Sequence, residues 1–300
     1  MASRVRIGIS GWNYKGWRGK FYPPKLRQKD ELAYASGLFP SIEINGTFYG
    51  LQRPSSFLTW VEQTPRDFEF AIKGSRYITH MLKLKNVEQA LANFFASGPL
   101  ALGAKLGPFL WQFPPQLAFN AVRFEEFFNL LPQTTTAAAE LARRHDQRLE
   151  GRAFTEPVRH RPLRHAVEIR HESFRSPEFI RLLRRYRIAN VVADTVDWPR
   201  LMDVTSDFVY CRLHGSEVLY TSGYTNADLD LWAARIRAWA NGQDCDRTHP
   251  ENAFACQDPP RDRTARDVYV YFDNDAKVYA PADAQTLIQK VNALLAAKAA

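Results

Sequence analysis

Two short segments place ionisable and amide side chains at the end of an apolar strand pattern, where they could transfer protons or bind an anion. In residues 41–47 and 166–171, apolar and polar side chains alternate, so a β-strand would send the two kinds to opposite faces. The polar faces carry Glu43 and Asn45 in the first segment and Glu168 in the second. Because a buried, unpaired ion costs several kcal/mol, these charges must be paired, solvated at a strand end, or kept for a ligand.

Eight segments with strand character position these groups, and helical patterns lie between most of them. The strands are predicted at 4–10, 41–48, 68–73, 107–113, 165–170, 189–194, 208–213 and 268–273. Strands that alternate with helices indicate parallel βαβ units, and eight strands are the number that closes a barrel. The sequence therefore predicts an α/β fold, a TIM-type (β/α)8 barrel forming a single domain over 1–300. Segments 134–163 and 241–266 are predicted to be surface insertions within it.

Local signals predict where several helices begin. Pro54 suits the first turn of a helix over 54–64, and Ser176 before Pro177 is a good N-cap. Asn86 followed by Gln89 resembles a capping box. We also expect Asn226 to cap a helix with an apolar stripe, and a closing helix over 283–299.

Composition limits the classes of protein that need to be considered. The chain has 300 residues, 45% of them hydrophobic, which is enough for a large core and argues against disorder. The net charge of +8 favours anionic partners, but we interpret the arginines of 143–164 and 181–187 as surface charge, because nucleic-acid domains usually carry a denser basic stripe. Three cysteines without a CxxC pair predict no disulfide framework and a reducing compartment.

The sequence contains no recognisable targeting signal or cofactor-binding motif. No apolar signal core follows Met1, and no run approaches a membrane span, so we predict a cytoplasmic protein without a membrane partner. The glycines after the first strand lack the GxGxxG spacing, and neither a P-loop nor a GxSxG motif occurs. We therefore predict no cofactor.

An ordered set of motifs resembles the YecE-like family, domain of unknown function 72 (DUF72). The motifs are Gly11-Trp12, Phe21-Tyr22-Pro23, Glu43-Ile44-Asn45-Gly46-Thr47-Phe48-Tyr49, Lys73 with Thr79-His80, Gln112-Phe113-Pro114-Pro115, Glu168-Ile169-Arg170-His171 and Arg212-Leu213-His214-Gly215. The resemblance runs from about residue 6 to about residue 290. It implies a TIM-type barrel and no particular activity.

In such a barrel the working face lies at the carboxyl ends of the strands, where side chains from several strands converge. The candidate catalytic residues at this mouth are Lys73, Glu43, Glu168 and His214. The candidate substrate-binding residues are Trp12, Asn45, Tyr49, Gln112, Arg170, His171, Asp194, Arg212, Tyr224 and Asn274. At the end of the last strand, Asp273 is the alternative to Asn274. The loop from Trp12 to Tyr22, which mixes aromatic and basic residues, is the candidate rim or lid.

Each candidate also has a plain structural interpretation. Lys73 could act as a base or a Schiff-base nucleophile, but an ion pair with Glu43 is favoured. His214 could transfer a proton with Asp194 or Glu168 fixing its tautomer, or it could simply be hydrogen-bonded structure.

The arginines and aromatic rings allow two interpretations as well. Arg170 and Arg212 could capture a carboxylate or phosphate with two hydrogen bonds each, or form salt bridges with nearby acids. Rim aromatics could stack on a sugar or nucleobase, or seal the barrel.

A metal site is the rival to this arrangement. Glu43, Glu168, His171, Asp194 and His214 could supply ligands. Against it, no HxH or HxxxH pair marks a strand end, and Lys73 with the two arginines would repel a cation. We therefore predict no metal.

Three functions remain open from the sequence. The first is an enzyme that binds a small anionic or sugar-like, polyhydroxyl substrate at the mouth. The second is a nucleic-acid binding or processing barrel, similar to barrel endonucleases, that uses the basic segment and the aromatic rim. The third is a barrel that binds a metabolite without chemistry.

Overall fold

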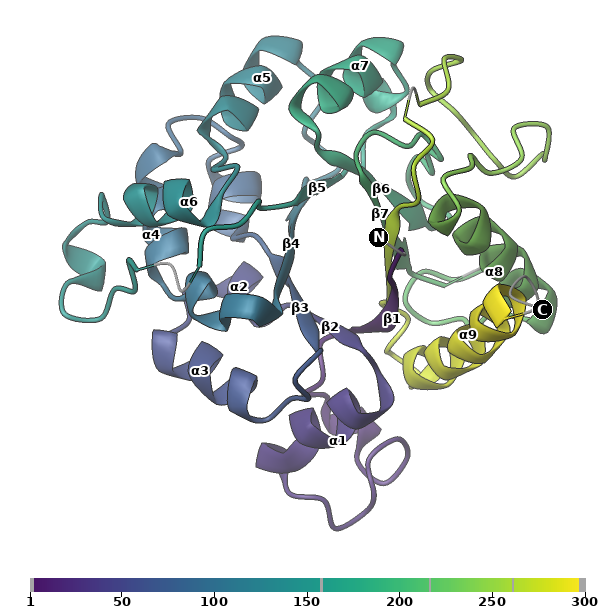
Figure 1. Cartoon of the computed structure of the whole chain (residues 1–300), viewed down its shortest axis with the longest axis horizontal. Coiled ribbons are helices and arrows are strands. Elements are labelled where there is room, and N and C mark those ends of the chain that lie inside the picture. Colours follow the sequence, from purple (N-terminus) through teal and green to yellow (C-terminus); the bar gives the residue numbers. More distant parts are fainter. Residues whose placement is uncertain (1–2, 157–158, 216, 261, 297–300) are drawn as a thin grey trace.

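The eight predicted strands close into one parallel barrel. The computed structural model describes residues 3–156, 159–215, 217–260 and 262–296. The strands are β1 (Val5–Ser10), β2 (Ser41–Ile44), β3 (Glu69–Lys73), β4 (Leu106–Gln112), β5 (His165–Glu168), β6 (Ala189–Asp194), β7 (Phe208–Leu213) and β8 (Asp267–Phe272). Each strand pairs in parallel with its neighbours in sequence, and β8 pairs with β1 to complete the ring (Figure 1). The predicted TIM-type (β/α)8 barrel is confirmed.

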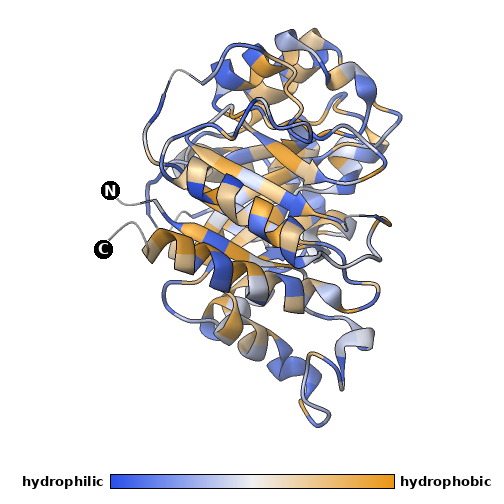
Figure 2. Cartoon of the chain, turned by 90° about the vertical axis from the view of Figure 1, so that its right-hand side faces the viewer, coloured by the Kyte–Doolittle hydropathy of each residue, from blue (hydrophilic) through white to orange (hydrophobic). Residues whose placement is uncertain are grey.

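Helices surround the barrel and cover the outer faces of its strands (Figure 1). They are α1 (Glu31–Leu38), α2 (Gly46–Tyr49), α3 (Pro54–Glu62), α4 (Glu88–Ala96), α5 (Ala121–Leu130), α6 (Thr135–Ala142), α7 (Pro177–Tyr186), α8 (Asn226–Ala240) and α9 (Tyr279–Ala296). In Figure 2 the strands are largely hydrophobic, whereas the helices alternate hydrophobic and hydrophilic residues, as expected for helices with one buried face. Within the described part of the chain, no helix is long and apolar enough to cross a membrane.

The capping predictions hold in part. Ser176 caps α7, since its side chain accepts the Glu178 backbone N–H at 3.2 Å. The cap of α8 is Thr225 rather than Asn226, because Thr225 and Asp228 form a reciprocal capping box. The predicted box at Asn86 is wrong: this residue has a positive φ of 50°, and α4 begins without a side-chain cap.

The predicted second strand is too long. It ends at Ile44 because the chain turns directly into the short helix α2. This turn leaves Asn45 just beyond the strand end, still beside the barrel interior.

The two segments predicted as surface insertions are tied to the barrel. In the 134–163 segment, α6 is half-buried rather than exposed at the surface, because it packs against α4. The described residues of 241–266 contain no helix or strand. The Asp203 carboxylate accepts the backbone N–H groups of Ala255 (2.8 Å) and Cys256 (3.1 Å), which fixes this segment against the loop after β6.

The barrel interior has bulky aromatic side chains on one side and small ones on the other. Phe208, Tyr210, Tyr269 and Tyr271 of β7 and β8 pack against alanines from β3, β5 and β6. Three tyrosine hydroxyls also make polar contacts inside the barrel. Tyr269 donates to Glu69 at 2.8 Å, Tyr210 donates to Glu43 at 2.6 Å, and Tyr271 lies 2.6 Å from the Ser41 hydroxyl. Polar side chains therefore run through the barrel to its carboxyl end.

Candidate functional site

An ion network centred on Arg212 occupies the carboxyl end of the barrel interior. Arg212, on β7, is fully buried. Its Nη1 donates to Glu168 Oε2 at 2.6 Å, and its Nη2 reaches Glu43 Oε1 at 2.9 Å and Asp273 Oδ2 at 2.8 Å. Carboxylates at or near the carboxyl ends of three strands, β2, β5 and β8, thus meet at one guanidinium from β7, as the fold predicts.

The two glutamates have no free carboxylate oxygen. Ser10 Oγ donates to Glu43 Oε1 at 2.5 Å, while Tyr210 occupies Glu43 Oε2. Glu168 Oε1 receives both Nε (2.9 Å) and Nη2 (2.7 Å) of Arg170. Both glutamates and Arg212 are fully buried, so this part of the network binds itself rather than a ligand.

The network also keeps its acids ionised. Burial alone would raise the pKa of Glu168, but the Arg212 and Arg170 guanidiniums hold it well below the usual range. Burial likewise opposes ionisation of Asp273, and Arg212 followed by His214 brings its pKa far below that of an ordinary aspartate. Neither group is therefore a proton donor near neutral pH.

His214 lies within the network as a neutral ring. Its Nδ1 is 3.1 Å from Asp273 Oδ2, and its Nε2 is 3.8 Å from Glu168 Oε2. Burial, reinforced by Arg212, lowers the pKa of His214. The partner at Nδ1 is Asp273 and not Asp194, which reaches His214 only through its backbone carbonyl, 3.0 Å from the His214 N–H.

Arg170 lies between the network and the outside. Its guanidinium covers the Trp198 ring at 4.0 Å from the ring centre, and its Nη2 donates to the Tyr220 hydroxyl at 3.2 Å. The Nη1 group makes no hydrogen bond within the described chain, and the side chain is 12% exposed. Arg170 can therefore still donate to an anion at the mouth, whereas Arg212 cannot.

Lys73 ends β3 without any ion-pair or hydrogen-bond partner for its amine among the described residues. The predicted pair with Glu43 does not form, because Arg212, Ser10 and Tyr210 already occupy that carboxylate. The Lys73 Nζ lies instead 4.5 Å from the centre of the Phe48 ring. Burial, followed by repulsion from Arg212, lowers the pKa of Lys73 to about 8.

Two amide side chains beside Lys73 also have unmatched polar atoms. Asn45 follows β2 and Gln112 ends β4, so the three residues belong to neighbouring strands. Asn45 uses its Nδ2 to reach Ser10 Oγ at 3.0 Å, which leaves Oδ1 buried and unpaired. Gln112 is 5% exposed, and its side chain makes no hydrogen bond to any residue that the structure describes. Because buried polar atoms are normally satisfied, these amide groups are the unmatched polar atoms of this half of the mouth.

Three predicted binding residues do not join the mouth. Asp194 points outward from β6, where it accepts Arg200 at 2.6 Å and the indole N–H of Trp232 at 3.2 Å. Tyr224 is buried, and its hydroxyl accepts the Gly215 N–H at 3.1 Å. Asn274 is also buried and donates to Ser222 O (3.0 Å) and Asp283 Oδ2 (2.8 Å). These residues support the loops that follow β6, β7 and β8.

Three more lie at or outside the rim. Trp12 packs edge-to-face on Trp60, with ring centres 5.3 Å apart. His171 Nδ1 lies 2.8 Å from Ser173 Oγ, at the cap of a short helical turn. Tyr49 is 72% exposed beside Phe48.

The loop after β1, which is the candidate lid, packs against the barrel. Trp17 and Tyr22 are almost fully buried, and Tyr22 donates to the Trp12 carbonyl at 2.5 Å. The Tyr14 hydroxyl donates to the Ser10 carbonyl, also at 2.5 Å. Its aromatic residues therefore seal one side of the mouth.

The sequence reasoning left the residue after β8 open and missed other residues of the mouth. Of the two alternatives, Asp273 and not Asn274 contacts Arg212 and His214, as strand alternation from Tyr269 and Tyr271 indicates. Trp198 and Tyr220 come from loops, where no periodic signal exists. His80 lies on a single π-helical turn (Tyr77–Met81) with its ring centre 5.1 Å from that of Phe48, and burial with Arg170 nearby lowers its pKa to about 4.

The charges at the mouth do not form a metal site. Among the residues placed by the structure, no group of three or more His, Cys, Asp and Glu side chains is arranged to hold a metal ion. Arg212 occupies the position between the carboxylates where a cation would otherwise lie.

Comparison with known proteins relates the whole chain to one family. A family described as "Protein of unknown function DUF72" matches residues 6–299. UPF0759 protein YunF of Bacillus subtilis is 32% identical over 116 residues, covering 37% of this chain and 40% of that protein. UPF0759 protein YecE of Escherichia coli K12 is 31% identical over 143 residues, covering 41% of this chain and 50% of that protein. The alignments thus span about half or less of these relatives.

Two solved structures share the fold. A DUF72 family protein from Thermotoga maritima has a TM-score of 0.72 at 23% identity, with 96% of this chain and 99% of that chain covered. A DUF72 family protein from Enterococcus faecalis has a TM-score of 0.68 at 16% identity, with coverages of 96% and 95%.

Proposed function

Since the chain belongs to the DUF72 family of proteins of unknown function, we propose that it is an enzyme acting on a small anionic or polyhydroxyl substrate, with the Lys73 amine as the reacting group. The observation that carries this proposal is the isolation of that amine. The acids at the mouth are engaged with arginines, yet Lys73 Nζ makes no ion pair or hydrogen bond within the described chain and lies against the Phe48 ring.

The lowered pKa of Lys73 gives the amine its reactivity. At pH 7, a pKa of about 8 leaves roughly a tenth of the amine neutral, about 300-fold more than at an ordinary lysine. A neutral amine can remove a proton next to a carbonyl group. It can also add to the carbonyl carbon and expel water, giving a Schiff base. Both routes require a substrate with a carbonyl group.

The unpaired atoms around Lys73 indicate the rest of the substrate. The carboxamide oxygens of Asn45 and Gln112 can accept hydrogen bonds from hydroxyl groups. Arg170 Nη1 can donate to a carboxylate or phosphate. This combination suits a short hydroxylated chain with one carbonyl and one anionic group.

Reductive trapping tests the proposal. Wild-type protein would be incubated with small hydroxy-aldehydes and hydroxy-ketones that carry a phosphate or carboxylate, and then treated with borohydride. Deuterium exchange into the same compounds, followed by NMR, would report proton removal. We expect an adduct on Lys73 or exchange into one compound, and loss of the signal in Lys73→Met.

The exposed Lys85 provides the matched control. Lys85→Met should retain the signal. Adducts shared equally between the two lysines, or exchange that survives in Lys73→Met, would contradict the proposal. Saturable binding of one compound without adduct, exchange or product would favour the metabolite-binding alternative.

A further inference from the structure

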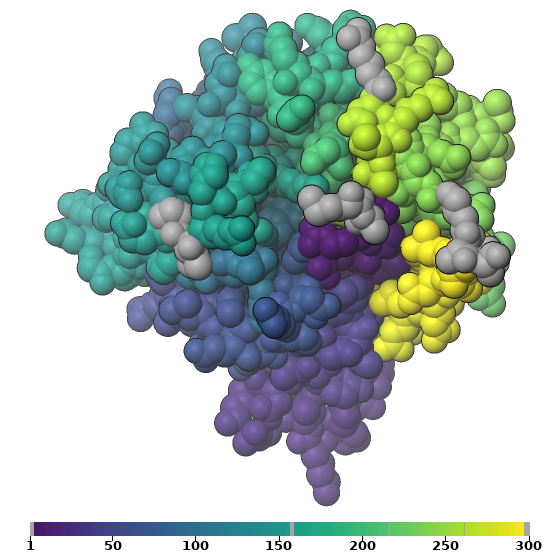
Figure 3. All heavy atoms as spheres, viewed as in Figure 1, coloured from purple at the N-terminus to yellow at the C-terminus, as the bar shows by residue number. Residues whose placement is uncertain are grey.

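A second concave surface lies at the amino end of the barrel strands, opposite the mouth that contains Lys73. It is a groove of about 1520 Å³. Its floor is formed by residues at or beside the starts of strands, among them Arg4, Glu69, Leu106 and Arg164. Figure 3 shows this face, hollowed between the 134–163 segment and the segment that precedes β8.

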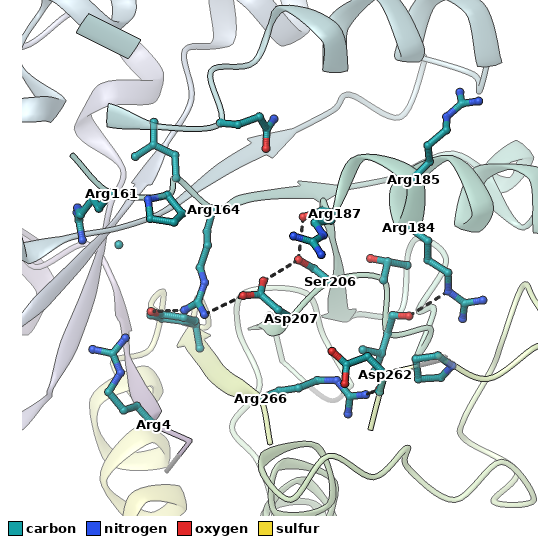
Figure 4. A pocket seen from close by; sticks show the side chains of 18 of the residues that line it. Arg4, Arg161, Arg164, Arg184, Arg185, Arg187, Ser206, Asp207, Asp262 and Arg266 are labelled. Carbon is teal, nitrogen blue, oxygen red and sulfur yellow. Dashed lines mark hydrogen bonds and ion pairs between the residues drawn. The ribbon is translucent and has the colours of Figure 1, made fainter. Parts of the chain in front are cut away.

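The charge of this groove is strongly positive. Among the residues that the structure describes, nine arginines line it against four carboxylates, and no lysine takes part. They come from the residues just before β1 and β5, the 134–163 segment, α7 with its C-cap, and the 241–266 segment, so that regions distant in sequence supply one surface (Figure 4).

Two of the four carboxylates are already paired on the floor of the groove. Glu69 lies 2.6 Å from Arg4, and Asp207 lies 3.2 Å from Arg164. The arginines of the floor are therefore neutralised by carboxylates, and the excess positive charge lies along the walls.

Most of the wall arginines form no ion pair, although Arg185 pairs with Glu125, which lies outside the groove lining. Arg181 and Arg187, at α7, and Arg263, in the 241–266 segment, are exposed and make no side-chain hydrogen bond or ion pair within the described chain. Arg184 and Arg266 are held only by uncharged groups, chiefly backbone carbonyls such as Asp258 O, 2.9 Å from Arg184 Nη2. These five arginines thus form no salt bridge within the described chain, and Asp262 is the lining carboxylate that lies near Arg187 and Arg266.

We propose that this groove binds the phosphodiester backbone of a nucleic-acid duplex. A guanidinium group can donate two parallel hydrogen bonds to a phosphate, whereas a lysine ammonium acts as a point charge. The basic residues of the lining are all arginines, which favours the paired hydrogen bonds. The volume exceeds the roughly 300–1,000 Å³ of small-molecule pockets, which indicates an extended ligand.

The residue types in the lining favour a double-stranded over a single-stranded nucleic acid. Of the lining residues placed by the structure, Tyr269 is the only aromatic one, and it is buried and hydrogen-bonded to Glu69. Single strands are usually bound by stacking their bases on exposed aromatic rings, and this groove offers none. Contact through phosphates alone therefore favours a duplex, bound without base readout.

Salt-dependent binding tests this inference. A fluorescent duplex of about 20 base pairs and random sequence would be titrated with wild-type protein and with the variant Arg181→Gln/Arg187→Asn/Arg263→Gln. Asn is chosen at 187 because this residue has a positive φ of 54°, which Asn tolerates. Loss of three phosphate contacts should lower the slope of log K against log[salt] by about 2.7 and weaken binding on the order of 100-fold or more at 0.1 M salt.

A matched variant at the opposite face separates the two ends of the barrel. Lys15→Gln/Lys20→Gln/Arg76→Gln removes the same charge from exposed positions in the loops after β1 and β3 and should bind like wild type. Thermal melts of both variants check that the fold is intact.

Four results would overturn the proposal. They are wild-type protein that does not bind the duplex at low salt, a groove variant that binds like wild type, a mouth variant that loses the affinity instead, and equal affinity for polyglutamate. Tighter binding of a single strand of the same length would refute the duplex assignment.

Discussion

Replacing Arg212 with methionine should destabilise the protein more than any other single arginine substitution at the mouth. The variant retains volume and apolar packing but leaves Glu43, Glu168 and Asp273 without their shared cation. Removing one partner of a buried pair typically costs about 3–5 kcal/mol, because the remaining charge stays buried. Here three carboxylates depend on Arg212, so we expect at least the upper part of that range at pH 7.

The pH dependence of this loss gives a sharper test. In the wild type, the folded-state pKa values of Glu168 and Asp273 lie below their unfolded values. Their stabilising contribution is therefore full above the unfolded pKa values and is lost as the pH falls through the folded ones. In Arg212→Met the carboxylates are destabilised when ionised, so the stability deficit should shrink as the pH is lowered from 7 towards 4.

Urea unfolding at several pH values, with Arg185→Met as control, measures both effects. Arg185 pairs with Glu125 at 2.5 Å on the surface, where the side chains are 57% and 41% exposed, so its loss should cost less than about 1 kcal/mol. A deficit for Arg212→Met within that same range, or one that does not change with pH, would refute the assignment of a mutually dependent buried network.

Further predictions concern backbone packing and a buried histidine. A Cβ on Gly8 would lie 1.8 Å from the Ser41 carbonyl oxygen, so Gly8→Ala should lower the free energy of unfolding by about 3 kcal/mol or more. Gly37 lies on the open side of α1, so Gly37→Ala should raise the free energy of unfolding by about 0.5–1 kcal/mol. Denaturation curves of both variants check this, and similar effects would contradict it. Burial lowers the pKa of His165 to about 4, and its neutral ring accepts the Trp111 indole N–H at 3.2 Å. As the pH falls, the unfolded chain protonates this histidine at a higher pH than the folded protein does, so the free energy of unfolding should fall by about 2–3 kcal/mol between pH 6.5 and 4. In His165→Gln, this contribution to the dependence of the free energy of unfolding on pH should disappear. An unchanged pH dependence would show that another group titrates.

Strand alternation predicted the fold well and the mouth only partly. Eight strands could be identified because each is a short apolar run followed by a turn, and Glu43, Lys73, Glu168 and Arg212 indeed converge. Which of these side chains form ion pairs could not be predicted. One arginine can contact three acids only if the four side chains lie at the same height along the barrel axis, and that height depends on how far each strand extends.

Two errors had a signal that was not used. The inward face of β8 contains Tyr269 and Tyr271, so the next inward residue is Asp273 and not Asn274. By the same alternation, Ala193 faces the barrel interior and Asp194 faces α8. Position at a strand end was weighed above the face on which the side chain lies.

The arginine groove had only a partial signal in the sequence, since the arginines of 143–164 and 181–187 stood out but were interpreted as surface charge. Its arginines are separated by up to about 260 residues in sequence, and the 241–266 segment lacks periodicity, so nothing along the chain indicated that this segment faces α7. Individually, each arginine resembled ordinary surface charge. The groove emerges only when the strand starts, α7 and the segment before β8 are placed together.

The pH dependence of Lys73 acylation tests the central claim most directly. Trace acetic anhydride, applied from pH 6 to 11 and followed by peptide mass spectrometry, gives a titration curve for each lysine. We expect half-maximal reactivity of Lys73 near pH 8, with the exposed Lys85 as the internal reference in the same experiment. A Lys73 curve that coincides with that of Lys85, or a Lys73 amine that does not react at any pH, would contradict the account of an isolated, reactive amine at the mouth of the barrel.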